Sequence, residues 1–144
     1  MKRNGSCLCG AVTYEIADAP GEAGVCHCGM CRKWTGGINV AMHLKAEDVV
    51  FEGSEAIAHY TSSEWAERGF CSRCGSSLYY RMTAEGPMQG DLFIGLGTLD
   101  DTDGLRLTEE IFIDRKPAFY SFAEETRKMT EGEFMEMVAA PPPG

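Results

Sequence analysis

The chain has 144 residues, which is enough for one domain with a buried core and too few to expect two. Its formal net charge is -9, so nucleic acid is a poor partner, since phosphate backbones are bound by clustered Lys and Arg. No apolar segment approaches the length of a membrane-spanning helix, and we expect a cytoplasmic protein without membrane contact. Abundant glycine and recurrent turn signals favour a mainly β fold over a helical bundle.

The apolar pattern predicts short strands separated by turns. Alternating Val12, Tyr14 and Ile16 predict a strand that follows a glycine-closed turn. Further strands are expected within 38–44, 49–51, 57–60, 77–82, 91–96 and 105–113, with a helical turn at 31–34. Residues 130–133 have the form of a capping box and predict a short helix after them. We expect a single zinc-binding domain over 1–140 and a disordered tail at 141–144.

Seven cysteines form the most informative pattern in the chain. They fall in three clusters, Cys7-x-Cys9-Gly10, Cys26-His27-Cys28-x-x-Cys31 and Cys71-x-x-Cys74-Gly75. A disulfide framework is the rival interpretation, but the odd count, the lack of a signal peptide and the tight spacings argue against it. The clusters therefore predict metal binding, and zinc is the metal that tetrahedral thiolate sites favour.

The two-cysteine turns predict a closed zinc site. Cys7, Cys9, Cys71 and Cys74 supply four sulfurs, which saturate a tetrahedral ion and leave no place for a substrate. A glycine after each pair lets the backbone turn toward the thiolates. We expect this zinc to be structural and to contribute folding energy, because the two turns are far apart in the sequence.

The remaining cluster predicts an open zinc site. Cys26, Cys28 and Cys31 leave one position for water or a substrate, as in catalytic zinc sites, and a thiol entering there would be held as a nucleophilic thiolate. The alternatives are a fourth protein ligand, a redox-active cluster or a metal-free one. His27 is a candidate fourth ligand, but between two ligands its ring is expected to point away from the ion.

Three basic residues are candidates for attracting an anionic thiol. Arg32 and Lys33 follow the open site directly, and the competing interpretation is that they are simply exposed. Arg68, between Trp65 and the second glycine-closed turn, has less positional support.

With these residues placed, the chain resembles the glutathione-dependent formaldehyde-activating enzyme family, whose domain is shared with centromere protein V. The resemblance covers 5–120. It rests on Gly5-Ser6-Cys7-Leu8-Cys9-Gly10-Ala11-Val12, Cys26-His27-Cys28-Gly29-Met30-Cys31-Arg32-Lys33, Phe70-Cys71-Ser72-Arg73-Cys74-Gly75-Ser76, Gly97-Thr98-Leu99-Asp100-Asp101 and Ile111-Phe112-Ile113-Asp114-Arg115-Lys116. Three ordered cysteine motifs with their glycines make chance a poor explanation.

The resemblance implies a fold and an activity. The fold would be an Mss4-like β-tent of antiparallel sheets stapled by zinc, with short helical segments. It also implies two zinc ions, a structural one on Cys7, Cys9, Cys71 and Cys74 and a catalytic one on Cys26, Cys28 and Cys31. The reaction would be that of a carbon-sulfur lyase on S-hydroxymethylglutathione, with glutathione and formaldehyde as partners.

Two positions depart from the family pattern. Glu110 stands where a histidine is common, and Phe119 where a tryptophan is common. An acidic group there either alters substrate contacts or is only packed. The alternative function is a noncatalytic zinc-binding module that uses the same fold as an interaction surface. The sequence carries no indication of oligomeric state.

Overall fold

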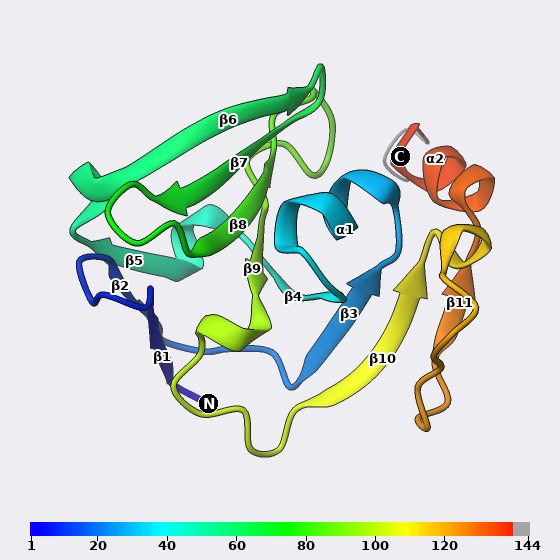
Figure 1. Cartoon of the computed structure of the whole chain (residues 1–144), viewed down its shortest axis with the longest axis horizontal. Coiled ribbons are helices and arrows are strands. Elements are labelled where there is room, and N and C mark those ends of the chain that lie inside the picture. Colours follow the sequence, from blue (N-terminus) through cyan, green and yellow to red (C-terminus); the bar gives the residue numbers. More distant parts are fainter. Residues whose placement is uncertain (140–144) are drawn as a thin grey trace.

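The computed structural model describes residues 1–139, in which strands predominate (Figure 1). The strands are β1 (Arg3–Ser6), β2 (Thr13–Ile16), β3 (Glu22–Cys26), β4 (Asn39–Leu44), β5 (Val49–Glu52), β6 (Ile57–Ser63), β7 (Ala66–Cys71), β8 (Ser77–Met82), β9 (Leu92–Gly95), β10 (Arg106–Ile111) and β11 (Arg127–Met129). The helices are α1 (Gly29–Thr35) and α2 (Glu131–Ala139), with short 3-10 helices η1 (Ala46–Asp48), η2 (Ser54–Ala56), η3 (Leu96–Thr98) and η4 (Ile113–Arg115). The expected mainly β class is confirmed, whereas the tail predicted at 141–144 lies outside the described residues.

The strands form two sheets. One has the order β1-β2-β5, and the other has the order β11-β10-β3-β4-β9-β8-β7-β6. Most neighbours are antiparallel, as a β-tent requires, but β10 runs parallel to both β3 and β11. The expectation of antiparallel sheets did not include these two pairings. Parallel neighbours need a crossover connection, and local turn signals in the sequence do not predict one.

The core lies between the two sheets. Ile16 of β2, Met42 of β4, Leu78 of β8 and Ile94 of β9 belong to one hydrophobic cluster and are almost completely buried. Tyr14 is buried beside Ile16, as the predicted alternation requires. Burying apolar surface from both sheets stabilises their packing and holds the turns that carry the cysteines.

Elements with strong local signals appear where they are expected. The turn that carries Cys71 and Cys74 connects β7 to β8, and β8 has the predicted bounds. Helix α1 ends at Gly36, whose φ of 74° is the left-handed conformation that favours glycine. The capping box is formed, since Thr130 N–H donates to Glu133 Oε1 at 3.0 Å and Glu133 N–H donates to Thr130 Oγ1 at 3.2 Å.

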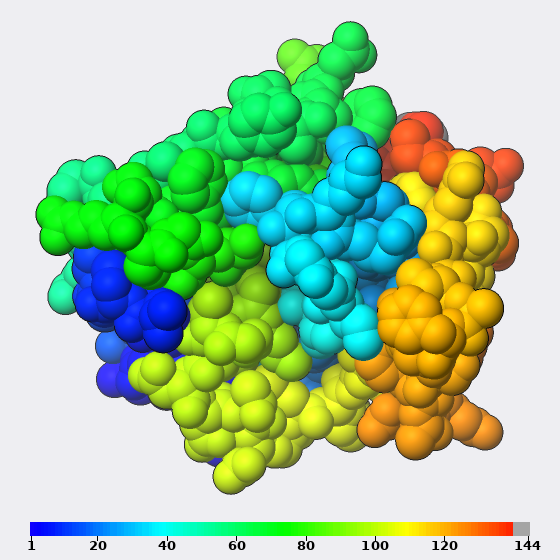
Figure 2. All heavy atoms as spheres, in the orientation of Figure 1, coloured from blue at the N-terminus to red at the C-terminus, as the bar shows by residue number. Residues whose placement is uncertain are grey.

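Helix α1 occupies the middle of one face of the molecule. In Figure 1 it lies in front of the large sheet, between the β8–β9 side and the β3–β10 side. Figure 2 shows the same helix in cyan, with green segments on one side and the yellow and orange segments of the chain on the other. Segments that are distant in sequence therefore lie around α1. Within residues 1–139, no helix has the length and apolar character needed to cross a membrane.

Candidate metal centres and active site

The first cysteine cluster joins two turns that are far apart in the sequence. Cys7 and Cys9 lie in the turn between β1 and β2, and Cys71 and Cys74 lie at the turn between β7 and β8. The turns also bind each other directly, because Leu8 N–H donates to the Ser76 hydroxyl at 3.0 Å. The structure thus brings together the four cysteines that the sequence grouped.

Both turns aim backbone N–H groups at the sulfurs. Val12 N–H donates to Cys7 Sγ at 3.3 Å, and Cys74 N–H donates to Cys71 Sγ at 3.5 Å. The glycine that follows each pair has a positive φ, 78° at Gly10 and 79° at Gly75, so a side chain there would strain the turn. Such N–H groups stabilise negative charge on the thiolates, which a metal requires.

The donor set of this cluster fits a zinc ion. Four sulfurs about 2.3 Å from one tetrahedral ion lie about 3.8 Å apart. Here Cys7 Sγ is 3.6 Å from Cys9 Sγ, and Cys9 Sγ is 3.8 Å from Cys71 Sγ. Hydrogen bonds from the side chain and backbone of Ser76 lower the pKa of Cys74 to about 5. A lowered pKa favours the thiolate form in which cysteine binds a metal.

The second cluster lies at the end of β3 and the start of α1. Cys26 ends β3, Cys28 precedes the first residue of α1, and Cys31 is buried within that helix. The three sulfurs lie within 4.8 Å of one another. All seven cysteines belong to the described residues and are free thiols, so the structure contains none of the disulfides considered as the rival interpretation.

The second cluster concentrates its negative charge on one sulfur. Hydrogen bonds from the thiols of Cys26 and Cys31 lower the pKa of Cys28 to about 2. The backbone N–H of Cys31 also donates to Cys28 Sγ at 3.3 Å. Three soft sulfur donors suit zinc, and they leave one tetrahedral position without a cysteine ligand.

Arg68 is the basic residue that reaches this cluster. Its Nη1 and Nη2 atoms both donate to Cys31 Sγ at 3.6 Å, and its guanidinium carbon lies over the rings of Tyr80 and Trp34, 5.0 Å and 5.9 Å from their centres. The same charges affect Tyr80, because burial and the neighbouring Cys31 thiol raise the pKa of its hydroxyl. Sequence analysis found little positional support for Arg68, because the pairing of β7 with β8 decides which side chains it contacts.

The other two basic candidates take different places. Arg32 is exposed on α1, and its Nε donates to the backbone carbonyl of His27 at 3.4 Å. Lys33 is exposed one residue further along. Arg32 thus helps to hold the turn of the second cluster, and neither side chain is described in contact with a cysteine sulfur.

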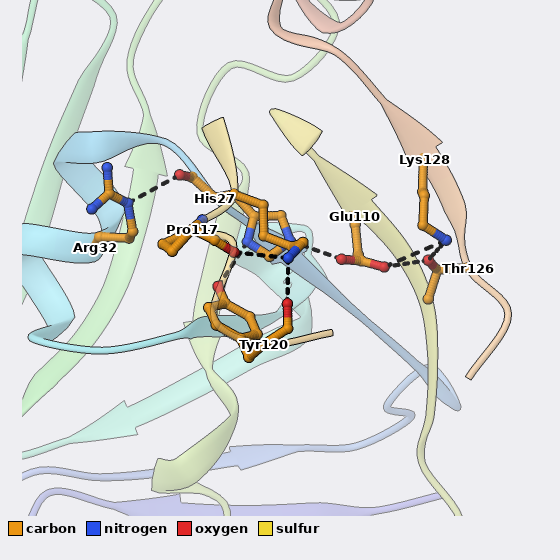
Figure 3. Close-up of polar contacts among 8 residues, drawn as sticks. His27, Arg32, Glu110, Pro117, Tyr120, Thr126 and Lys128 are labelled. Atoms are coloured by element: carbon orange, nitrogen blue, oxygen red, sulfur yellow. Dashed lines mark hydrogen bonds and ion pairs between the residues drawn. The ribbon is translucent and has the colours of Figure 1, made fainter. Parts of the chain in front are cut away.

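His27 is held away from metal binding by a buried polar network (Figure 3). Its Nε2 is 2.8 Å from Glu110 Oε1, and its Nδ1 is 3.0 Å from the Tyr120 hydroxyl. Thr126 donates to Glu110 Oε2, and Lys128 Nζ lies 3.8 Å from the same oxygen. Both ring nitrogens are therefore engaged, which agrees with the expectation that the ring points away from the ion.

The two departures from the family pattern have separate outcomes. Glu110 is 2% exposed and pairs with His27, so this acidic group supports the turn between two cysteines. Burial would raise its pKa, but hydrogen bonds from Thr126 and His27 outweigh burial and lower it. Phe119 is 85% exposed. Sequence reasoning noted Glu110 but missed its partners, which lie on different strands and loops.

A cavity of about 210 Å³ lies beside Arg68, between α1 and the large sheet. Its walls come from α1, β4, β7, β8, β9 and η3, and they include Trp34, Val40, Tyr80, Phe93 and Thr98. Arg68 is the one charged residue among the described residues that line it. Aromatic and apolar side chains share the lining of this cavity with polar ones such as Asn39 and Ser77, and no sequence motif predicted it.

Together these features describe a mainly β protein with two clusters of cysteine sulfurs that could each hold a metal ion, one of which adjoins a cavity. Residues 2–115 match the family model described as glutathione-dependent formaldehyde-activating enzyme. The chain belongs to this family and is an enzyme. Its membership confirms the resemblance that the cysteine motifs indicated.

Two curated relatives agree with this assignment, and one solved structure shares the fold. A Schizosaccharomyces pombe protein named as an uncharacterized lyase is 31% identical over 134 residues, covering 93% of this chain and 95% of the relative. A Halomonas elongata protein, provisionally named as a glutathione-dependent formaldehyde-activating enzyme, is 37% identical over 87 residues, 55% of each chain. A Rhodobacter sphaeroides crystal structure shares the fold, with a TM-score of 0.57 and 24% identity over 73% of this chain and 99% of that one.

Proposed function

We propose that this enzyme is a zinc-dependent carbon-sulfur lyase that acts on the adduct of formaldehyde with a small thiol. Glutathione is the first candidate thiol. The observation that carries the proposal is the cluster of Cys26, Cys28 and Cys31, whose three sulfurs leave one tetrahedral position for a substrate and lie next to Arg68 and the cavity. Family membership and the name of the fission yeast relative support lyase chemistry.

The two centres would have different roles. Cys7, Cys9, Cys71 and Cys74 would hold a structural zinc, because four protein sulfurs complete its coordination. Cys26, Cys28 and Cys31 would hold a second, catalytic zinc. Zinc bound there would supply a Lewis acid that keeps a substrate thiol in its nucleophilic thiolate form at neutral pH.

The chain's own residues would bind the substrate and offset its charge. The cavity would receive the organic part of the thiol, and Arg68 would place a positive charge beside the sulfurs. In the synthetic direction the thiol sulfur forms a bond to the aldehyde carbon, its proton leaves to solvent, and the carbonyl oxygen takes up a proton. In the lyase direction the hydroxyl of the adduct loses its proton to solvent, the carbon-sulfur bond breaks with its electron pair staying on sulfur, and formaldehyde leaves.

The chemistry of the cysteines also bears on location. Seven free thiols that serve as metal ligands suit a reducing compartment, where disulfides are rare. A cytoplasmic location is therefore part of the proposal.

The experiment that tests this function is NMR exchange spectroscopy of formaldehyde mixed with a panel of thiols. The zinc-loaded protein should accelerate exchange between the free thiol and its hydroxymethyl adduct for at least one thiol. Cys28→Ser should return the exchange rate to that of buffer because it removes a ligand of the second centre. Arg106→Gln, which changes a side chain 76% exposed on β10, should retain the wild-type rate.

The opposite result has a clear meaning. If the wild-type protein with both centres loaded leaves every exchange rate at its buffer value, the lyase proposal is wrong. The noncatalytic binding module would then be the better account of the two clusters. An unaltered rate in Cys28→Ser would instead show that the second centre is not the active site.

A further inference from the structure

Arg68 is a buried cation whose surroundings select an anionic neighbour. Its side chain comes from β7, is 2% exposed, and lies 5.0 Å from the ring centre of Tyr80 and 5.9 Å from that of Trp34. A buried charge is costly unless other groups compensate it. The two aromatic faces contribute part of that compensation through cation–π attraction.

The polar contacts of Arg68 point to the second cysteine cluster. Its Nε donates to the Ser62 hydroxyl at 3.1 Å, and its two terminal nitrogens donate to Cys31 Sγ at 3.6 Å. Among the ion pairs of residues 1–139, none joins Arg68 to a carboxylate. The polar partners of this guanidinium are therefore the Cys31 sulfur and the Ser62 hydroxyl, with no carboxylate among the described residues.

The net charge of the second centre depends on Arg68 and on the fourth ligand. Three thiolates around a divalent ion carry a net charge of about -1, and Arg68 brings the buried group to about zero. A neutral fourth ligand would leave that balance unchanged. A substrate thiolate would add one negative charge, which would make the group about -1 with Arg68 and about -2 without it.

We propose that Arg68 makes the second centre selective for an anionic sulfur ligand, acting as a positioning residue that offsets the charge of the substrate thiolate. This inference rests on the proposed function. Arg68 also lines the cavity, so a thiol bound there lies on the side of the cluster where the positive charge is. Coulomb attraction at this range in a partly buried site is large enough to change affinity by about tenfold or more.

The test compares an anionic ligand with a neutral one at the same centre. Protein with cobalt in place of zinc is titrated with glutathione, with 2-mercaptoethanol and, separately, with imidazole, and binding is followed by the visible and near-ultraviolet absorption of cobalt. The proteins are wild type, Arg68→Gln, Arg68→Lys and the exposed control Arg106→Gln. All four are compared at one pH and one salt concentration.

The expected result is a change in the ratio of the affinity for thiols to the affinity for imidazole. Arg68→Gln should weaken thiol binding by about tenfold or more and leave imidazole binding within about twofold. Arg68→Lys keeps the charge and should retain most of the wild-type ratio, and Arg106→Gln should match wild type. If Arg68 has a purely structural role, its replacement would weaken the binding of thiols and of imidazole alike, and that outcome overturns the inference.

Failure of the inference is distinguishable from failure of the proposed function. If wild type exchanges thiol adducts and Arg68→Gln binds thiols as tightly as wild type, only the role of Arg68 is wrong. If wild type shows no spectral response to any thiol, both are wrong. If Arg68→Gln loses cobalt or unfolds, the measurement on Arg68→Lys decides whether the inference holds. A tenfold change in the ratio of its thiol affinity to its imidazole affinity, relative to wild type, contradicts the proposal.

Discussion

The turn between Cys26 and Cys28 is supported by His27, whose ring nitrogens are engaged by other side chains rather than by the cysteine cluster. His27 is 1% exposed and connects this turn to Glu110 on β10 and to Tyr120. A histidine whose two nitrogens are both engaged has a fixed ring orientation, as in metal sites where outer residues orient the ligands. The order of the second cluster therefore depends on groups that do not touch a metal.

Replacing Glu110 with Gln should change how the stability of the protein depends on pH. The pKa of Glu110 is lowered in the folded protein, so its contribution to stability is fully present above its usual pKa of 4.5 and is lost as pH falls through the lowered value. At pH 7 we expect Glu110→Gln to reduce the free energy of unfolding by about 1–3 kcal/mol. Chemical denaturation at a series of pH values measures the difference between variant and wild type.

The neighbouring carboxylate provides the control. Glu109 lies on the same strand with a side chain that is 42% exposed and paired with Arg127, so Glu109→Gln should change stability little. A difference between Glu110→Gln and wild type that stays constant down to pH 2 would contradict the assigned role of the Glu110 charge.

At the scale of elements, the two cysteine clusters act on different parts of the fold. The first joins the β1–β2 turn of the small sheet to the β7–β8 turn of the large one. The second joins residues at the end of β3 to residues of α1, which follow each other closely in the chain. A metal in the first centre therefore closes a long loop and links two sheets, whereas one in the second closes a short loop.

Serine substitutions in the two clusters should separate these effects. We expect Cys74→Ser to lower the melting temperature sharply or to prevent folding, because it opens the link between the sheets. Cys28→Ser should keep the protein folded and remove one metal ion per chain. Thermal melting followed by circular dichroism, with zinc measured by mass spectrometry, provides both quantities. Equal destabilisation by the two variants would show that the clusters share one structural role.

At the scale of the whole molecule, the hydrophobic core and the second centre are largely independent. The core residues come from strands of both sheets, β2 and β5 of the small sheet and β4, β7, β8 and β9 of the large one, and they include Cys7 and Cys71 of the first cluster. None of the three cysteines of the second cluster belongs to that core within the described residues. Loss of the second metal should therefore leave the packed core intact.

Removing metal in steps should show this independence. A moderate chelator should first take up about one zinc per chain while the circular dichroism spectrum and the cooperative melting transition persist. Release of the other zinc should coincide with loss of the folded spectrum. The measurement follows zinc with a colorimetric indicator and folding by circular dichroism in the same sample. Simultaneous release of both ions with unfolding would exclude a division into a structural and an exchangeable centre.

Local signals predicted much of the fold correctly. The strand at 77–82, the end of α1 at Gly36 and the capping box at Thr130 each depend on a few neighbouring residues. The strands β1, β3 and β11 were not expected, because each is short and lacks a distinctive pattern of its own. Strands at 49–51 and 57–60 were expected around one turn, but β5 and β6 belong to different sheets.

The sequence by itself determined the grouping of the cysteines, because ligand spacing and the adjacent glycines are local properties of each turn. The tertiary structure decided what surrounds the second group. Arg68 reaches Cys31 from β7, and Glu110 reaches His27 from β10, across separations of 37 and 83 residues. Such contacts depend on the order and register of strands in the sheet, which long-range packing determines and no local pattern encodes.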